Sequence, residues 1–183
     1  MNKAIFLDRD GTIIEDKNYL SNIDDINFLE GTFEGLKKLQ KEYLLIIVTN
    51  QSGVAKGYFN EKKVIEINKE IESQLYTNGV KILETLYCPH HKNGIIKEYS
   101  INCECRKPKT GLIEKVVKKY NIDLSNSYVI GDKDSDIQLG KNCKCKSILI
   151  RNNNYKNTIK PDFVSNNILE AANYIFNNES SEN

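Results

Sequence analysis

The sequence predicts an α/β fold in which a doubly wound parallel sheet is flanked by helices. Two observations lead to this prediction. Short apolar runs have the length of strands, and the run at residues 44–48 is rich in branched residues, as expected for a strand buried on both faces. Between these runs, apolar residues recur at helical spacing. Strands that alternate with helices are typical of parallel sheets.

Each strand is expected from a run of apolar residues that ends at polar or small residues. These runs cover residues 4–7, 44–48, 82–87, 128–130 and 147–150, with a short extended piece at 161–164. Apolar stripes at helical spacing predict helices at residues 33–42, 60–77, 111–120 and 169–176, and a further helix follows residue 134. Asn60 is expected to cap the long second helix.

The length of 183 residues suits a single domain with a real core. We assign residues 1–176 to this domain and 177–183 to a frayed polar tail, which leaves no room for a separate cap domain. The net charge of +1 gives no support to nucleic acid or an acidic membrane as a partner. No apolar stretch approaches the roughly 18 residues of a membrane span, and no signal peptide is expected. We expect a cytoplasmic monomer.

Two aspartates follow the first predicted strand, in the pattern Asp8-Arg9-Asp10-Gly11-Thr12. Open α/β sheets place their ligands at the carboxyl ends of strands, and alternation along an extended chain lets both carboxylates point the same way. Hard oxygen ligands of this kind suit magnesium. In the functional interpretation, Asp8 attacks phosphorus and Asp10 shuttles the proton. The alternative is an ordinary turn, because Asp, Gly and Thr are common turn residues.

Uncharged polar residues follow the second buried strand, at Thr49, Asn50, Gln51 and Ser52. Their hydroxyl and amide groups offer hydrogen bonds to a phosphate without adding charge. A polar turn is the competing interpretation, and the position at the end of a buried strand favours the phosphate site.

Arg106 and Lys107 stand shortly before the helix expected at 111–120. A lysine near a helix start conflicts with the helix dipole, which favours anions there. A bound phosphate would resolve this conflict, whereas the alternative is a solvated basic loop.

A third strand end, after residues 128–130, presents another carboxylate. Asp132 lies nearest to the strand, and we assign it to magnesium. Asp136 is the second choice for this acid.

Five cysteines need an explanation, because disulfides are rare in the cytoplasm. Three thiols and one imidazole form a Cys₃His set, which is a recognised closed tetrahedral zinc site; its members are Cys88, His90, Cys103 and Cys105. His91 is an alternative to His90, and chance clustering of buried cysteines is the alternative to zinc. Such a site has no open coordination position, so the zinc would be structural. Cys143 and Cys145 are assigned to packing.

The carboxylate, threonine and lysine motifs occur in the order found in the haloacid dehalogenase (HAD) superfamily of phosphohydrolases, which the chain resembles. The matching residues are Asp8, Asp10, Thr49, Lys107 and Asp132. The resemblance implies a HAD-like fold in which Asp8 is the nucleophile and Asp10 the general acid and base. It also implies that Asp8, Asp10 and Asp132 hold magnesium.

With the cysteine segments included, the motifs resemble the D-glycero-D-manno-heptose 1,7-bisphosphate 7-phosphatase family. This resemblance implies removal of the 7-phosphate of a small sugar bisphosphate, during synthesis of activated heptose for bacterial surface polysaccharides. It implies that Thr49 and Lys107 steady the phosphoryl group, that Arg106 contacts substrate, and that the Cys₃His set holds zinc. Further substrate contacts are implied at Asp16, Lys17, Asn18, Tyr19, Asn50, Gln51, Ser52 and Lys133.

Four alternatives to this function stay open. Histidinol-phosphate phosphatase shares the zinc loop, and a polynucleotide 3′-phosphatase belongs to the same superfamily but should carry a basic stripe. A response-regulator receiver also uses Asp, magnesium and Lys, but its phosphorylated Asp follows a mid-chain strand. A zinc-stapled interaction module would not need acids at two strand ends.

Overall fold

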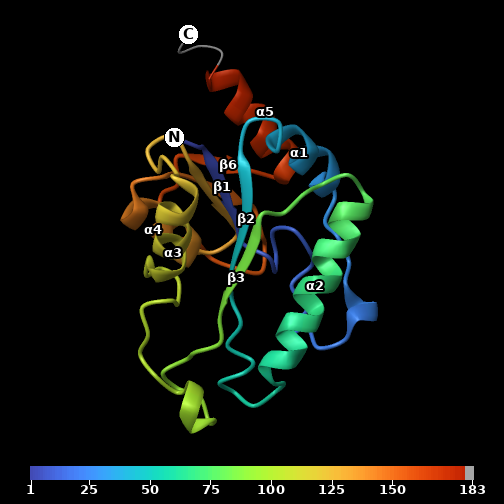
Figure 1. Cartoon of the computed structure of the whole chain (residues 1–183), viewed down its shortest axis with the longest axis vertical. Helices are drawn as coiled ribbons and strands as arrows, with labels where there is room; N and C mark the ends of the chain where they lie inside the picture. Colours follow the sequence, from blue (N-terminus) through green and yellow to red (C-terminus); the bar gives the residue numbers. More distant parts are fainter. Residues whose placement is uncertain (180–183) are drawn as a thin grey trace.

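The computed structural model describes residues 1–179, whose strands form one six-stranded sheet in the order β3-β2-β1-β4-β5-β6. All the pairs of neighbouring strands are parallel (Figure 1). The strands are β1 (Ala4–Leu7), β2 (Leu44–Asn50), β3 (Glu84–Cys88), β4 (Tyr128–Gly131), β5 (Lys146–Ile150) and β6 (Phe163–Ser165). The chain starts in the middle of the sheet and builds outward in both directions, which confirms the doubly wound prediction.

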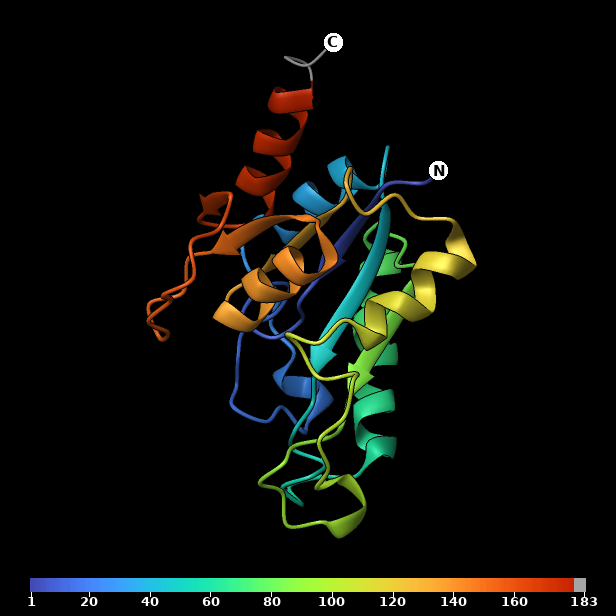
Figure 2. The same ribbon diagram turned by 90° about the vertical axis from the view of Figure 1, so that its left-hand side faces the viewer.

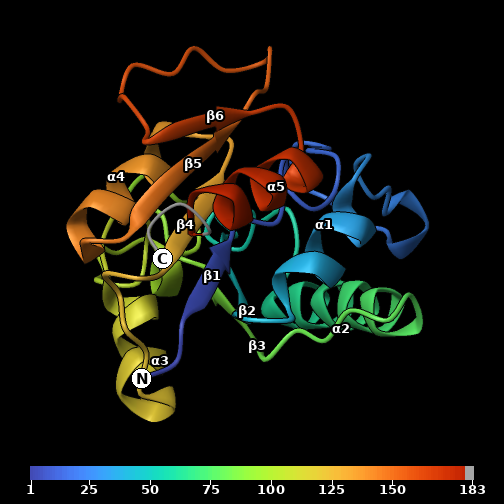
Figure 3. The same cartoon turned by 90° about the horizontal axis from the view of Figure 1, so that it is seen from above.

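Helices cover both faces of this sheet, as seen from above in Figure 3. They are α1 (Thr32–Leu39), α2 (Glu61–Thr77), α3 (Gly111–Tyr120), α4 (Asp134–Cys143) and α5 (Ile168–Glu179). Two short 3-10 turns lie outside these layers, η1 (Ile23–Asp25) and η2 (Lys97–Tyr99). Helices α1, α2 and α5 pack on one face of the sheet, and α3 and α4 pack on the other. The buried residues of the two sets accordingly belong to two different core clusters.

The alternation of side chains along the central strand divides the core into these two clusters. Ile5 and Leu7 of β1 point into the cluster beneath α1, α2 and α5, whereas Ala4 and Phe6 point into the other. All four side chains are fully buried. A strand that is apolar at every position is therefore what a helix layer on each face requires.

The element boundaries agree with the sequence predictions to within a few residues. Asn60 caps α2 as expected, since its side chain accepts a hydrogen bond from the Lys63 amide at 3.1 Å. The final helix begins at Ile168 and continues through Glu179, so the predicted tail is wrong for residues 177–179. The remaining residues of the predicted tail, 180–183, lie outside the described part of the chain. None of the helices within residues 1–179 has the length and apolar character needed to cross a membrane.

The carboxyl ends of β2 and β3 and the segments that follow them point to one end of the molecule, away from the amino terminus (Figure 2). The longest connections there are residues 8–31 after β1 and 89–110 after β3. Parallel strands bring their carboxyl ends to the same edge, so this end collects the polar residues that the sequence places after each strand.

Candidate active site and metal-ligand clusters

Three buried carboxylates meet where β1 and β4 end. Asp8 follows β1, Asp132 follows β4, and Asp136 lies in the first turn of α4. One oxygen from each lies within 4.8 Å of the others. Asp132 Oδ1 is buried and has no hydrogen-bond partner among residues 1–179. Oxygen donors that are this close and incompletely satisfied fit a hard divalent cation such as magnesium.

Lys107 links two of these carboxylates. Its Nζ lies 2.7 Å from Asp8 Oδ1 and 2.7 Å from Asp136 Oδ1, and it donates to the Val48 carbonyl at 2.8 Å. The ammonium group is almost fully buried, so these ion pairs are screened little by solvent. The structure thus places the predicted phosphate-binding lysine beside the predicted nucleophile.

The charges in this cluster divide the acids into two kinds. Burial opposes ionisation of Asp8, but the charges of Lys107 and Lys133 outweigh it and lower the pKa. Burial together with the neighbouring Asp8 charge raises the pKa of Asp132 to about 8. Burial likewise raises the pKa of Asp136 to about 6, with Lys107 opposing the shift. Asp8 is therefore ionised at neutral pH, whereas Asp132 needs a cation nearby to be so.

Asp10 lies beside this cluster but has different partners. Its carboxylate accepts from Arg9 Nε at 3.1 Å and from Gln51 Nε2 at 2.7 Å. Arg9 is itself fully buried and donates to Asn68 Oδ1 at 2.7 Å. The carboxylate of Asp10 does not belong to the group of three, so its assignments to magnesium and to proton transfer stay predictions.

The polar segment after β2 forms the wall beside Lys107. Asn50 binds the main chain of Lys107 from both ends of its amide, accepting from the amide nitrogen at 3.1 Å and donating to the carbonyl at 3.2 Å. Thr49 Oγ1 accepts from Gln51 Nε2 at 2.9 Å. Asn50 therefore connects β2 to the loop that delivers the lysine.

A cleft of about 270 Å³ opens beside Asp10 and Lys107. Its lining includes most of the predicted substrate contacts: Asp16, Asn18, Tyr19, Asn50, Gln51, Ser52, Arg106, Lys107 and Lys133. A recess of about 40 Å³, lined by Asp8, Asp10 and Thr49, shares several of these residues and forms its floor. Lys17 lines neither space, and its ammonium pairs instead with Glu15 at 2.6 Å.

Tyr155 also lines the cleft, and sequence reasoning missed it. Its hydroxyl donates to Asp16 Oδ2 at 2.7 Å, and Lys133 Nζ lies 2.9 Å from the same oxygen. The ammonium of Lys133 also sits 4.6 Å from the centre of the Tyr155 ring. Tyr155 lies in a polar connection rich in asparagine, a composition that indicates a surface loop and carries no signal for a site.

Four metal-ligand side chains meet in the long connection after β3. Cys88 Sγ lies 3.5 Å from Cys103 Sγ and 3.1 Å from Cys105 Sγ, and His90 Nδ1 lies 3.2 Å from Cys105 Sγ. Sulfur atoms around a tetrahedral zinc ion would lie roughly 3.8 Å apart for bonds of about 2.3 Å. The cluster therefore fits zinc after a small expansion.

The structure distinguishes between the two neighbouring histidines. His90 points into the cluster, whereas His91 Nδ1 accepts a hydrogen bond from the main-chain nitrogen of Asn93 at 3.2 Å. The cluster is tied to the cleft through Arg106, whose Nη1 donates to the His90 carbonyl at 3.1 Å. Cys143 and Cys145 are buried in the core beneath α3 and α4, as predicted.

Comparisons with known proteins agree with this geometry. A model of the HAD-hydrolase-like family matches residues 104–171. A crystal structure of D,D-heptose 1,7-bisphosphate phosphatase from B. bronchiseptica, complexed with magnesium and phosphate, has a TM-score of 0.83 at 24% identity. The match covers 96% of this chain and 99% of that one. At this identity the likeness shows a shared fold.

Two relatives with higher identity define the family more narrowly. D-glycero-beta-D-manno-heptose-1,7-bisphosphate 7-phosphatase from Pasteurella multocida is 43% identical over 82% of this chain and 82% of its own length. D-glycero-alpha-D-manno-heptose-1,7-bisphosphate 7-phosphatase from Photorhabdus laumondii is 44% identical over 76% of each chain. The chain therefore belongs to the heptose-1,7-bisphosphate 7-phosphatase family of HAD-like hydrolases.

Proposed function

We propose that the protein hydrolyses the 7-phosphate of D-glycero-D-manno-heptose 1,7-bisphosphate through an aspartyl-phosphate on Asp8. The observation that carries this proposal is the recess in which ionised Asp8 lies next to Lys107, at the floor of a cleft lined with cations. The names of the relatives support the sugar bisphosphate as substrate. Such a reaction would serve the synthesis of activated heptose for surface polysaccharides.

In the first step, a carboxylate oxygen of Asp8 forms a bond to phosphorus and the bond from phosphorus to the sugar oxygen breaks. The electron pair stays on the sugar oxygen, which takes a proton from Asp10. In the second step, Asp10 accepts a proton from water, whose oxygen bonds to phosphorus and releases phosphate from Asp8. Hydrogen bonds from Arg9 and Gln51 keep the carboxylate of Asp10 beside the recess in both steps.

The phosphoryl group being transferred carries negative charge, which Lys107 and the Thr49 hydroxyl would stabilise. Asp8 and Asp132 would hold magnesium, together with Asp10 as the motif implies, and the ion would neutralise the developing charge. Arg106 and Lys133 place two further cations on the cleft, where they would bind the rest of a substrate with two phosphates.

We also propose that the Cys₃His cluster holds structural zinc. All four ligands come from the protein, so there is no open position for chemistry. The five unpaired cysteines support a reducing compartment, and we propose the cytoplasm. We propose that the enzyme works as a monomer, since Asp8, Lys107 and Asp132 already assemble into one site within a single chain.

A phosphate-release screen tests the substrate. Both anomers of the heptose bisphosphate, histidinol phosphate and a 3′-phosphorylated oligonucleotide are compared by kcat/KM, with and without magnesium. We expect the heptose bisphosphate to be preferred and magnesium to be required. Preference for histidinol phosphate or for the oligonucleotide would contradict the proposed substrate, and absence of phosphatase activity on all of them would contradict the enzyme class.

Replacing Asp10 with asparagine is expected to slow turnover by roughly 10²–10⁴-fold, because the sugar oxygen loses its proton donor. Aryl phosphates with good leaving groups need this proton less, so their burst-phase rate should fall less. The measurement compares the burst for a sugar phosphate and an aryl phosphate in the Asp10→Asn variant. An equal loss for both would show that Asp10 does not act as the acid.

Replacing Cys105 with serine is expected to remove zinc and to reduce kcat/KM on the order of 10²-fold. Cys105 directly precedes Arg106 and Lys107, and positioning errors of about 1 Å can have effects of this size. Magnesium dependence should remain, because Asp8 and Asp132 lie on separate strand ends.

Zinc content by elemental analysis, kcat, KM and a magnesium titration check this prediction. Cys143→Ser serves as the control, because Cys143 is a buried cysteine that does not belong to the Cys₃His set, and this variant should keep its zinc. A zinc-free Cys105→Ser variant with wild-type kcat/KM would rule out the positioning effect.

A further inference from the structure

The connection between β5 and β6, residues 151–162, binds both the side chain and the main chain of Asp132. The Asn152 side chain donates to Asp132 Oδ2 at 2.8 Å, and the Asn157 side chain donates to the Asp132 main-chain carbonyl at 3.1 Å. One residue further, the Thr158 hydroxyl donates to Asp134 Oδ2 at 2.8 Å. This connection therefore holds the end of β4 and the start of α4 in place.

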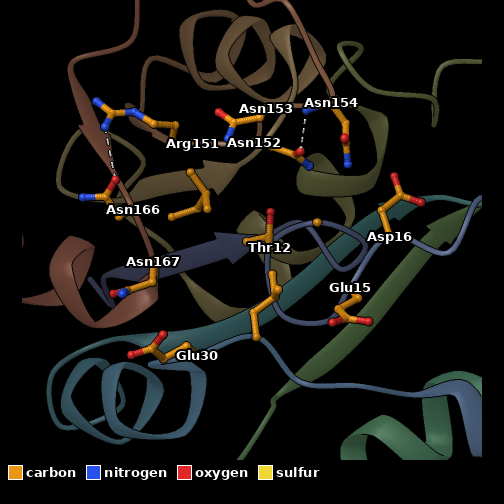
Figure 4. Close-up of a pocket in the computed structure, with 13 residues that line it drawn as sticks. Thr12, Glu15, Asp16, Glu30, Arg151, Asn152, Asn153, Asn154, Asn166 and Asn167 are labelled. Atoms are coloured by element: carbon orange, nitrogen blue, oxygen red, sulfur yellow. Dashed lines mark hydrogen bonds between the residues drawn. The ribbon is translucent and has the colours of Figure 1, made fainter.

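Both ends of the Asn152 amide are occupied. Its Oδ1 accepts a hydrogen bond from the Asn154 main-chain nitrogen at 3.0 Å, which Figure 4 shows as a dashed line. Because the oxygen is used within its own loop, the amino group is the end that faces Asp132. The turn at residues 152–154 thus sets the orientation of the amide that binds the carboxylate.

The two oxygens of Asp132 have different surroundings. Oδ2 binds Asn152 and is packed against Gly11, where a Cβ atom would lie only 2.2 Å away. Oδ1 is buried and has no hydrogen-bond partner within residues 1–179, and the ammonium of Lys133 lies 3.9 Å from it, beyond hydrogen-bond distance. The carboxylate is therefore fixed by one oxygen, and the other is left for a ligand.

We propose that Asn152 is a positioning residue for Asp132, which raises the affinity of the active site for magnesium. By binding Oδ2, it holds the carboxylate in one orientation and leaves Oδ1 as the oxygen that the ion takes. Hydrogen-bond partners of ligating carboxylates commonly have this effect, and their loss typically weakens metal binding by roughly 10–100-fold. This inference rests on the magnesium site of the proposed function.

The test is a calorimetric titration of the full-length protein with magnesium chloride in the absence of substrate. Asn152→Leu removes the donor at similar size, and Asn152→Ala removes it with less risk of a clash. We expect both variants to bind magnesium about 10–100-fold more weakly than wild type. At saturating magnesium, kcat should return to within a few-fold of wild type, because Asn152 lines neither the cleft nor the recess. Asn153→Ala is the control, because Asn153 is the exposed neighbour in the same loop.

The melting temperature and the zinc content of the variants without added magnesium report on folding separately. Wild-type protein that binds no magnesium would overturn the metal site itself and this inference with it. If the wild-type protein binds magnesium and both Asn152 variants bind it with the same affinity, the positioning role alone is overturned and the proposed function stands. A lower melting temperature with unchanged affinity would also overturn it, since the contact would then be merely structural.

Discussion

Replacing Asp8 with asparagine is expected to abolish phosphate release, with a loss of more than about 10³-fold in kcat. The amide keeps the shape of the side chain but loses the charge that attacks phosphorus and helps to hold magnesium. The fold should persist, because Lys107 keeps its ion pair with Asp136 and its hydrogen bond to the Val48 carbonyl. Phosphate release and the melting temperature are measured together.

Asp24→Asn provides the matched control, because it makes the same change at an exposed aspartate in η1, away from the cleft. Its turnover should equal that of wild type. Near-normal turnover in the Asp8 variant, confirmed by mass to contain asparagine, would show that another group is the nucleophile.

Replacing Lys107 with methionine is expected to impair both catalysis and stability. The change removes the cation between Asp8 and Asp136 and leaves buried carboxylates that repel one another. Breaking a buried ion pair in this way typically costs about 3–5 kcal/mol of unfolding free energy. The loss of phosphoryl stabilisation should lower kcat by roughly 10²–10³-fold as well.

The stability loss in this variant should depend on pH. With Lys107 present, the pKa of Asp8 lies below its unfolded value of about 4, whereas that of Asp136 already lies above it. Removing the cation should raise both pKa values in the folded state, that of Asp8 from below the unfolded value and that of Asp136 further above it. The stability deficit is therefore larger at pH 7 than at pH 5, and it shrinks as both carboxyls become protonated toward pH 4. Denaturant titrations at pH 7 and pH 5 measure the deficit. The control is Lys109→Met, which changes a partly exposed lysine of the same loop. Wild-type stability at pH 7 would contradict the buried ion-pair network.

Much of the fold can be predicted from the sequence because the physical signals are local. Successive residues are apolar throughout β1 and over the first five positions of β2, without the polar alternation of a half-exposed strand. This pattern is expected when helices cover both faces of the sheet. Once the strands are parallel, Asp8, Thr49 and Asp132 must lie at the same edge of the sheet, so their assembly into one site also follows.

Other features of the site depend on contacts between distant segments and have no local signal. Asp136 sits in the first turn of a helix, where an acid is expected anyway, and its ion pair with Lys107 appears only in three dimensions. Asn152 and Tyr155 lie in a connection whose composition predicts nothing but a loop. His90 and His91 are adjacent and chemically identical, so only the direction of each ring separates a zinc ligand from its neighbour.

The role of Asp8 as the carrier of the phosphoryl group is tested most directly by trapping the intermediate. Wild-type enzyme is mixed with the heptose bisphosphate, quenched with acid during turnover and reduced with borohydride, which converts an aspartyl-phosphate to homoserine. Peptide mass analysis then locates the modified residue. We expect homoserine at position 8, only when substrate and magnesium are both present; homoserine at another aspartate would contradict the proposed mechanism.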